Sequence, residues 1–370
     1  MAHSSKTKKI DTPLLVLSAL LVSVGFFVFT SASFGLFARK GFSLQDLFFD
    51  QMVLGLFLGF CALLVMLYVI PLKFIQKNAL YIFIGSILLT LLVFVPGVGF
   101  EHGGAHRWIL LGPISFQPSV VLKLGTIIYL AALLPLLKDR IGEFKYAVGV
   151  AGGILAVPAI ILLAEPDTGT FMVLFVAVCA MLIAGGMKIK HLVVLGLVAV
   201  FAVGVLAVAR PYVKERILTF IDPSRDPQGA SYQIQRSLVA IGSGGITGRG
   251  FGQSIQKFGS LPEPTGDSIF AVVGEEFGFI GGSAIIILFL LFAIRGLQIA
   301  RKTPDAFSGL LAVGIVILIV WQSFTNIGAM LGLIPLTGVP LVFISHGGTA
   351  LLFAFLEVGI LLNISKLQRL

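Results

Sequence analysis

The chain has 370 residues, of which 57% are hydrophobic and only 12% are charged. A soluble domain carries about a quarter charged residues, so this composition excludes a soluble globular protein. The apolar residues fall into repeated runs of roughly 17 to 25 residues, each long enough for an α-helix to cross a bilayer. We therefore predict an all-α polytopic membrane protein.

The apolar runs predict ten membrane-spanning helices. They lie near residues 13–33, 51–70, 78–97, 117–136, 146–163, 168–186, 191–210, 272–294, 306–330 and 347–363. The first follows three lysines in the charge order of a signal peptide, but its apolar stretch is too long for one, so we expect an uncleaved helix. No repeat or shift in composition marks a second domain, and residues 1–370 are expected to form a single transmembrane domain.

The basic residues are distributed unequally between the two sets of loops. Fifteen of the 26 Lys and Arg residues fall in the two tails and in alternate short loops, whereas the opposite short loops hold three. The positive-inside rule then places the N and C termini in the cytoplasm. The net charge of +9 thus mostly records topology and does not indicate nucleic-acid binding. One long segment before the eighth helix, about residues 211–271, becomes an extracytoplasmic loop.

This long loop contains a glycine-rich run and a group of acids. Six of the eleven residues from Gly242 to Gly252 are glycine. Such a run can bind phosphate through backbone amides, but it lacks the Lys-Ser/Thr of a P-loop, and a closely packed external loop is the favoured interpretation. Further on, Glu263 and Asp267 precede the eighth helix, and Glu275 and Glu276 lie near its start. Carboxylates at this depth either carry function or cap the helix.

Polar groups also occur near the outer ends of other spans. Arg107 precedes the fourth span, and Lys123 lies one to two turns inside it, where it either binds an anion or extends to the membrane interface. The break from Glu165 to Gly169 is typical of a tight turn, which explains Pro166 and Gly169 but does not require two acids.

Other polar groups carry weaker signals. His102 and His106, with Glu101, lie in a glycine-containing loop, so their spacing does not indicate a zinc site. The serines show no His-Asp arrangement, which disfavours protease or esterase chemistry. Interhelical hydrogen bonds account for the polar residues at membrane depth, which are Gln322, Asn326 and Glu357.

The predicted sidedness limits the chemistry. The acids face a compartment that, in a bacterium, lacks ATP and nucleotide sugars, so a group transfer there needs a substrate with its own activated bond. Lipid-linked diphosphate sugars meet this need, and their diphosphate suits Arg and Lys partners. A carboxylate could then deprotonate an acceptor hydroxyl while cations stabilise the leaving group.

Several sequence blocks occur in a fixed order along nearly the whole chain. They are Arg107–Trp108, Phe116–Ser119 with Lys123, Pro166–Gly169, Ile241–Gly245, Gly250–Ser254, Leu261–Glu263 with Asp267, Gly274–Glu276, and Asn326 through Gly338 to Gly348. In this order they resemble the SEDS family of shape, elongation, division and sporulation proteins, the FtsW and RodA peptidoglycan glycosyltransferases. The run Gln256–Phe258 is more similar to FtsW than to RodA.

The resemblance implies ten helices in the bacterial cytoplasmic membrane and polymerisation of lipid II on its outer face. The family's essential aspartate falls on Asp267, which would act as general base on the acceptor hydroxyl and yield a β-1,4 linkage with inversion. Arg107 and Lys123 would lie near the diphosphate. Glu263 and Glu276 would position or tune the site, and Lys257 and Ser345 would complete the set of substrate-binding residues.

The resemblance also implies ligands and partners. The substrates would be lipid II and an undecaprenyl-diphosphate-linked glycan, and a divalent cation, Mg or Mn, is expected. The partners would be a class B penicillin-binding protein and, if the chain is FtsW-like, other division proteins. A flippase for a lipid-linked substrate and a scaffold that only recruits the penicillin-binding protein are the alternatives, and neither would require a base at Asp267.

The chain departs from the family pattern at three places. Gly266 precedes the aspartate where the family usually has Thr, and Ser268 follows it in place of Phe. Val120 replaces the usual Glu, which removes a carboxylate near Lys123. His346 stands where the family usually has Tyr.

Overall fold

The computed structural model describes residues 9–38, 48–102, 105–111, 114–224, 228–229 and 231–368. Its main helices, in chain order, are α1 (Thr12–Ser33), α3 (Gly59–Tyr68), α4 (Leu72–Lys77), α5 (Ala79–Leu91), α6 (Pro118–Leu133), α7 (Phe144–Ala164), α8 (Thr168–Ala184), α9 (Ile189–Ala209), α10 (Pro211–Ile221), α11 (Tyr232–Gly244), α12 (Ile269–Lys302), α13 (Ala306–Met330) and α14 (Gly348–Ser365). The π-helix η2 (Asp50–Leu58) leads into α3. The 3₁₀ turns are η1 (Phe34–Ala38), η3 (Leu92–Phe94), η4 (Leu134–Leu137) and η5 (Gln256–Phe258).

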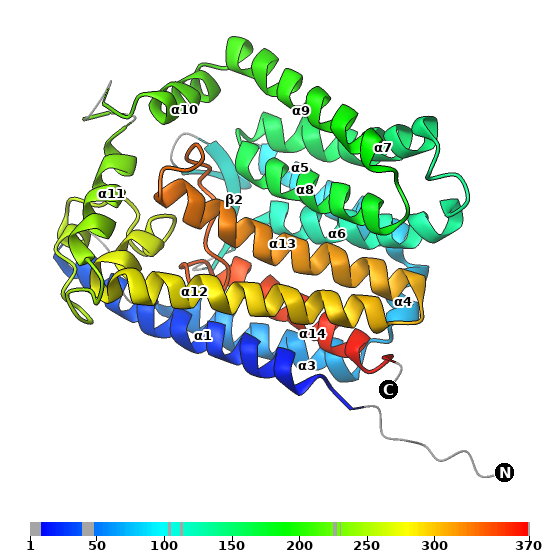
Figure 1. The fold of residues 1–370 in the computed structure, drawn as a ribbon, viewed down its shortest axis with the longest axis horizontal. Coiled ribbons are helices and arrows are strands. Elements are labelled where there is room, and N and C mark those ends of the chain that lie inside the picture. Colours follow the sequence, from blue (N-terminus) through cyan, green and yellow to red (C-terminus); the bar gives the residue numbers. More distant parts are fainter. Residues whose placement is uncertain are drawn as a thin grey trace.

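The helices confirm a polytopic membrane protein (Figure 1). Within the described ranges, eight helical segments are long and apolar enough to cross a membrane, and two more, Ala79–Phe94 and Thr168–Ala184, are apolar but shorter. Each of the ten predicted spans falls on one of these segments. Local chemistry sets several starts: Asp11 and Asp167 cap α1 and α8 by accepting the backbone N–H of Leu14 and Thr170.

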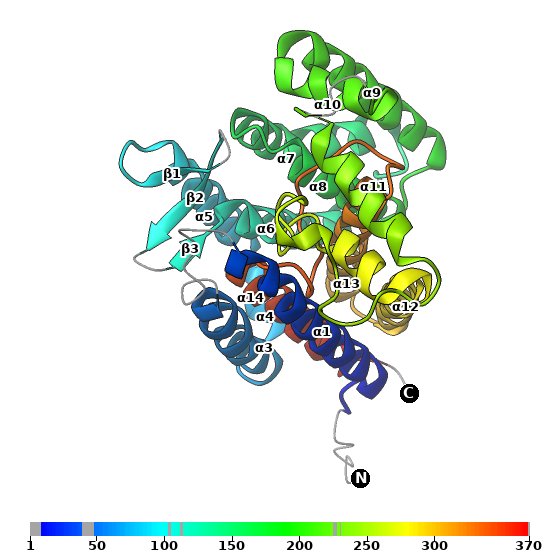
Figure 2. The ribbon, with the colours of Figure 1, turned by 90° about the vertical axis from the view of Figure 1, so that its left-hand side faces the viewer.

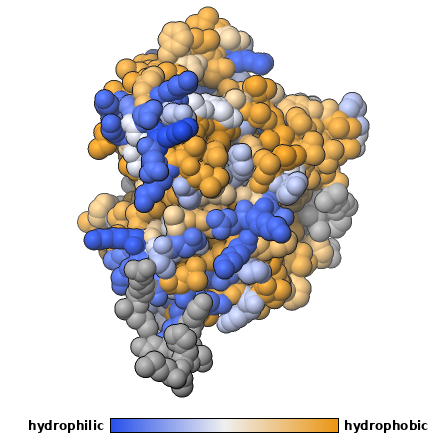
Figure 3. Space-filling view, turned by 90° about the vertical axis from the view of Figure 1, so that its right-hand side faces the viewer, coloured by the Kyte–Doolittle hydropathy of each residue, from blue (hydrophilic) through white to orange (hydrophobic). Residues whose placement is uncertain are grey.

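The start of α1 and the end of α14 lie at one end of the bundle (Figure 1). Arg295, near the end of α12, donates from Nε and Nη2 to the two carboxylate oxygens of Asp11, at 2.9 and 2.8 Å. The backbone N–H of Asp11 donates to Ser365 Oγ at the end of α14. Figure 3 shows hydrophilic residues gathered on this end among hydrophobic ones. Of the basic residues behind the topology prediction, five lie outside the described ranges, namely Lys6, Lys8, Arg39, Lys40 and Arg369.

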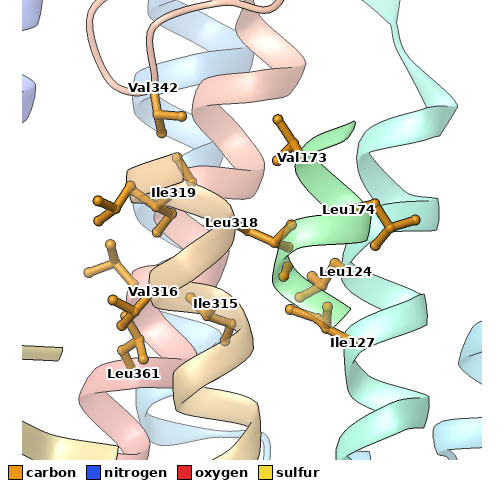
Figure 4. Packing of buried hydrophobic residues seen from close by; sticks show 14 of the residues in the cluster. Leu124, Ile127, Val173, Leu174, Ile315, Val316, Leu318, Ile319, Val342 and Leu361 are labelled. Atoms are coloured by element: carbon orange, nitrogen blue, oxygen red, sulfur yellow. The ribbon is translucent and has the colours of Figure 1, made fainter. Parts of the chain in front are cut away.

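Helix α13 forms the centre of the bundle. It packs against α12, α8, α6 and α14, and most of its residues are buried. Leucine, isoleucine and valine side chains from these helices fill the space around it (Figure 4). By contrast, only His191 and Leu195 are buried in α9. This helix therefore lies at the periphery and presents its apolar surface outward.

Glycines allow α14 to approach η2 and α3 closely. A methyl group on Gly55 would lie 2.9 Å from the Leu351 side chain, and one on Gly359 would lie 2.8 Å from the Leu63 carbonyl oxygen. Small residues at a helix seam permit this kind of packing inside a membrane. The seam matters for function because α14 follows directly from the segment that carries Ser345 and His346.

The opposite end of the bundle carries a small sheet and the helices α10 and α11 (Figure 2). The region between α5 and α6 was expected only to be a loop. Its described residues include three strands, β1 (Gly99–His102), β2 (Ala105–Leu111) and β3 (Ile114–Phe116), which form an antiparallel sheet in the order β1-β2-β3. The predicted long loop, 211–271, folds into α10, α11 and η5 in its described part. Its residues 225–227 and 230 lie outside the described ranges.

Candidate active site

A cavity of about 250 Å³ opens at this end of the bundle. Its walls come from α10, α11, the outer end of α13, the segment between α13 and α14, and the residue two before α12. The lining residues are Glu215, Arg216, Thr219, Gln233, Asp267, Asn326, Ala329, Met330, Leu336, Thr337, Gly338 and Val339. The structure thus gathers at one place residues that lie between positions 215 and 339 of the sequence.

Asp267 is held in this cavity through its own backbone. The Asn326 amide donates to the carbonyl oxygens of Asp267, at 2.8 Å, and of Val339, at 2.9 Å. Ser345 Oγ donates to the Gly266 carbonyl at 2.8 Å, and the His346 N–H donates to the Thr265 carbonyl at 2.7 Å. Ser345, predicted to bind substrate, therefore contacts the backbone beside Asp267 and does not line the cavity.

The surroundings of Asp267 favour a base that works near neutral pH. Burial and the neighbouring carboxylate of Glu263 raise the pKa of Asp267 to about 6, while the guanidinium groups of Arg107 and Arg216 oppose the rise. Glu263 itself is exposed, with a left-handed backbone (φ 44°), so its contribution is electrostatic. A carboxylate with this pKa is mostly ionised at pH 7 and is a better proton acceptor than an ordinary aspartate.

Two arginines supply positive charge beside Asp267. Arg216 on α10 donates to the Thr337 carbonyl at 3.3 Å and approaches Thr168 Oγ1 at 3.5 Å. Arg107 on β2 donates to the carbonyl of Glu165 at 3.0 Å and also to that of Pro166. Within the described ranges, neither guanidinium has a carboxylate within 4.0 Å, so both charges can serve an anionic ligand.

Arg216 was not singled out by the sequence. Three basic residues occur in this stretch, at 210, 214 and 216, and their spacing alone does not distinguish them. In α10, however, Arg216 falls on the half-buried face and its guanidinium lies over the ring of Tyr212, 5.8 Å from the ring centroid. The amphipathic pattern of residues 211–221 is the signal that could have identified it.

The turn between α7 and α8 places two acids next to Arg107. Asp167 caps α8, which accounts for one of them. Glu165 is 1% exposed, and neither of its carboxylate oxygens has a hydrogen-bond partner among the described residues. Burial, assisted by Asp167, raises the pKa of Glu165 to about 8, so it is mostly protonated at pH 7.

Lys123 lies beneath the cavity, inside the bundle. It is 7% exposed, and its Nζ donates to Oε1 of Gln322 on α13 at 2.6 Å. Its side chain therefore points toward the protein core, which contradicts the alternative that it extends to the membrane interface. The structure does not bring Lys123 into the cavity wall with Arg216 and Asp267.

Lys257 and Glu276 bind each other instead of lining the cavity. Lys257 Nζ lies 2.6 Å from Glu276 Oε1 and 3.0 Å from Ser31 Oγ, and both side chains of the ion pair are 0% exposed. The neighbouring Glu275 accepts hydrogen bonds from Ser254 Oγ and from the backbone N–H groups at the start of η5. These groups fasten the segment before Asp267 to α1 and α12.

The glycine-rich run packs against a kink in α12. Gly278 has φ 63°, which interrupts the helix and exposes backbone groups on both sides. The N–H groups of Arg249 and Gly250 donate to the carbonyls of Glu275 and Glu276, and two further bonds run the opposite way. A methyl group on Gly248 would lie 2.2 Å from the Glu276 carbonyl oxygen. The run is thus a closely packed loop, as the sequence favoured.

The described residues contain no group of three or more His, Cys, Asp or Glu side chains that could hold a metal ion. The side chains of Glu101, His102 and His106 lie outside the described part. The divalent cation expected from the resemblance thus finds no ligand set in the described ranges.

Comparison with known proteins identifies the family. The sequence model of the family named for FtsW, RodA and SpoVE matches residues 11–370, and this family is described as "Cell cycle protein". The chain belongs to this family. It is 37% identical to stage V sporulation protein E of Bacillus subtilis (strain 168), over 99% of this chain and 100% of that protein. It is 36% identical to a probable peptidoglycan glycosyltransferase FtsW of Geobacter sp. (strain M18), over 97% of each chain.

Solved structures agree with this assignment. One solved structure superposes with a TM-score of 0.79 at 28% identity, over 96% of this chain and 97% of that one. It is described by the words "Structural coordination of polymerization and crosslinking by a peptidoglycan synthase complex". The rod shape determining protein RodA of Thermus thermophilus superposes with a TM-score of 0.68 at 27% identity, over 96% of both chains. The chain therefore shares its whole membrane fold with these proteins.

Proposed function

We propose that this protein is a peptidoglycan glycosyltransferase that polymerises lipid II at the cavity around Asp267. The observation that carries the proposal is a buried carboxylate of raised pKa, Asp267, near Arg107 and Arg216, neither of which has a carboxylate within 4.0 Å among the described residues. The names of the relatives, probable peptidoglycan glycosyltransferase FtsW among them, support the same chemistry. The site lies at the end of the bundle away from the termini, which corresponds to the outer face of the bacterial cytoplasmic membrane.

The charges divide the reaction between two roles. Asp267 accepts the proton of the acceptor hydroxyl on the GlcNAc of lipid II as that oxygen attacks the anomeric carbon of the growing chain. The bond from this carbon to undecaprenyl diphosphate breaks, and its electron pair leaves with the diphosphate. Arg216 and Arg107 stabilise the negative charge that develops there. Attack opposite the leaving group inverts the anomeric carbon and gives a β-1,4 linkage.

The remaining predicted residues support this centre from outside the cavity. Glu263 tunes Asp267 through its charge, and Ser345 fixes the neighbouring backbone. Glu276 and Lys257 hold the preceding segment. A class B penicillin-binding protein is the proposed partner, because a relative of this fold belongs to a complex described as a peptidoglycan synthase. Other division proteins, and a Mg or Mn ion, stay predictions.

The test is a polymerisation assay that also reports transport. The full chain is purified, reconstituted into liposomes with fluorescent lipid II, and assayed with and without a class B penicillin-binding protein for glycan chains and for movement of lipid II between leaflets. Glycan chains without net transport are the expected result. Transport without glycan would establish a flippase, and neither product under any condition would leave only a scaffold.

A further inference from the structure

Two buried side chains of opposite charge lie on adjacent helices inside the bundle, away from the cavity. Lys123 on α6 is 7% exposed and Glu357 on α14 is 6% exposed, and the two helices are in contact. No direct ion pair within 4.0 Å joins them, but the negative charge of Glu357 acts on Lys123 more strongly than that of Asp167 does. A buried ion at membrane depth is costly unless a partner compensates it, so the two charges stabilise one another.

Lys123 in turn fixes the orientation of an amide. Its Nζ can only donate, so the 2.6 Å contact assigns the facing Gln322 atom as the oxygen. The amide nitrogen of Gln322 is then directed to the Pro340 carbonyl, at 3.1 Å. One turn further along α13, Asn326 holds the carbonyls of Val339 and Asp267. Two neighbouring amides of α13 therefore fix the 339–340 backbone, and one of them also fixes Asp267.

The sequence shows why Glu357 is needed. Position 120, one helical turn before Lys123 on α6, holds Val120, so this position offers Lys123 no carboxylate. Residues at i and i+3 share a helix face, so a carboxylate at 120 would lie next to Lys123. Without it, the charge of Lys123 must be compensated from another element, and α14 provides Glu357.

We propose that Glu357 is the counter-ion of Lys123 in this chain, and that the pair is a positioning element for Asp267. It acts through Gln322 and the 339–340 backbone, not through contact with substrate. The proposal rests on the glycosyltransferase function proposed above for its effect on rate. Its effect on the stability of the fold does not depend on that function.

The decisive experiment moves the carboxylate from α14 to α6. Glu357→Gln is expected to lower kcat about tenfold, within the range measured for coupled buried groups, while KM for lipid II changes less than about twofold. The double variant Val120→Glu/Glu357→Gln restores the carboxylate next to Lys123 and is expected to recover most of the rate. Asn363→Leu removes another polar side chain of α14, at the far end, and is the matched control, with unchanged kcat.

Thermal unfolding in detergent provides a readout that is independent of activity. Lys123→Met and Glu357→Gln should each lower Tm, and the variant with both changes should be more stable than the sum of the two predicts, because it leaves no unpaired charge. If wild type makes no glycan, the proposed function fails while this cycle still tests the pair. A wild-type rate in Glu357→Gln, no recovery in the relocated variant, or additive changes in Tm would overturn the proposal.

Discussion

Removing Arg216 should move the pH dependence of polymerisation. A methyl group on Gly338 would lie 3.4 Å from Asp267 Oδ2 and 3.7 Å from Arg216 Nη2, so these two atoms are at most about 7 Å apart. At an effective dielectric constant of about 20 to 80, a charge at this distance changes a pKa by about 0.4 to 1.7. Arg216→Gln should therefore raise the pKa of Asp267 from about 6 to about 7.

The sign follows from the role of Asp267 as a base, which must be ionised to act. The acid limb of the kcat profile should shift to higher pH by about one pH unit, and the ionised fraction at pH 7 should fall from about nine-tenths to about half. The assay is lipid II polymerisation from pH 5 to 9. Lys214→Gln removes the same charge from an exposed position of α10 and should leave the limb in place. An unshifted limb in Arg216→Gln, or an equal shift in Lys214→Gln, would refute the reasoning.

Three further predictions concern stability, measured by unfolding in detergent. The pKa of Glu165 is about 8 in the folded protein against an ordinary value of 4.5, so at pH 7 the side chain binds a proton on folding, which costs about 3 kcal/mol. Glu165→Gln should therefore be more stable than wild type at pH 7, and this difference in stability should vanish toward pH 4.5. A gap independent of pH would contradict this. Gly248→Ala should destabilise by about 1–3 kcal/mol, because φ is 79° and the Glu276 carbonyl is in the way, whereas Gly242→Ala, with open space, should not. Lys257→Met should cost about 3–5 kcal/mol, and adding Glu276→Gln should recover most of it if the buried pair is as described.

The membrane helices could be predicted because bilayer thickness imposes their length and composition. The sheet at residues 99–116 could not, because its strands have only three to seven residues and its glycines resemble those of a loop. The tight packing of Gly248 was favoured by composition. Its cause, the kink at Gly278, could not be foreseen, since the surrounding helix continues for 34 residues.

The site was predicted best where one residue carries the chemistry. Asp267 was identified through its motif, and the structure places it in the cavity. Lys257 was expected to bind substrate on the strength of the family resemblance, but it pairs with Glu276 across a packed loop that local spacing does not reveal. Arg216 was missed because the amphipathic pattern of residues 211–221, which sets it apart from its exposed neighbours, does not reveal what the inward face of α10 covers.

The central claim is that Asp267 is the base of a polymerase, and replacing its carboxylate tests it most directly. Asp267→Asn keeps the size of the side chain, and the Asn326 bond to the backbone carbonyl does not depend on the carboxylate. Glycan formation from purified lipid II is compared with that of wild type and of Glu263→Gln, which removes a nearby acid from an exposed position. We predict no glycan from folded Asp267→Asn and product from the other two. Wild-type product from Asp267→Asn would place the base elsewhere and contradict the account.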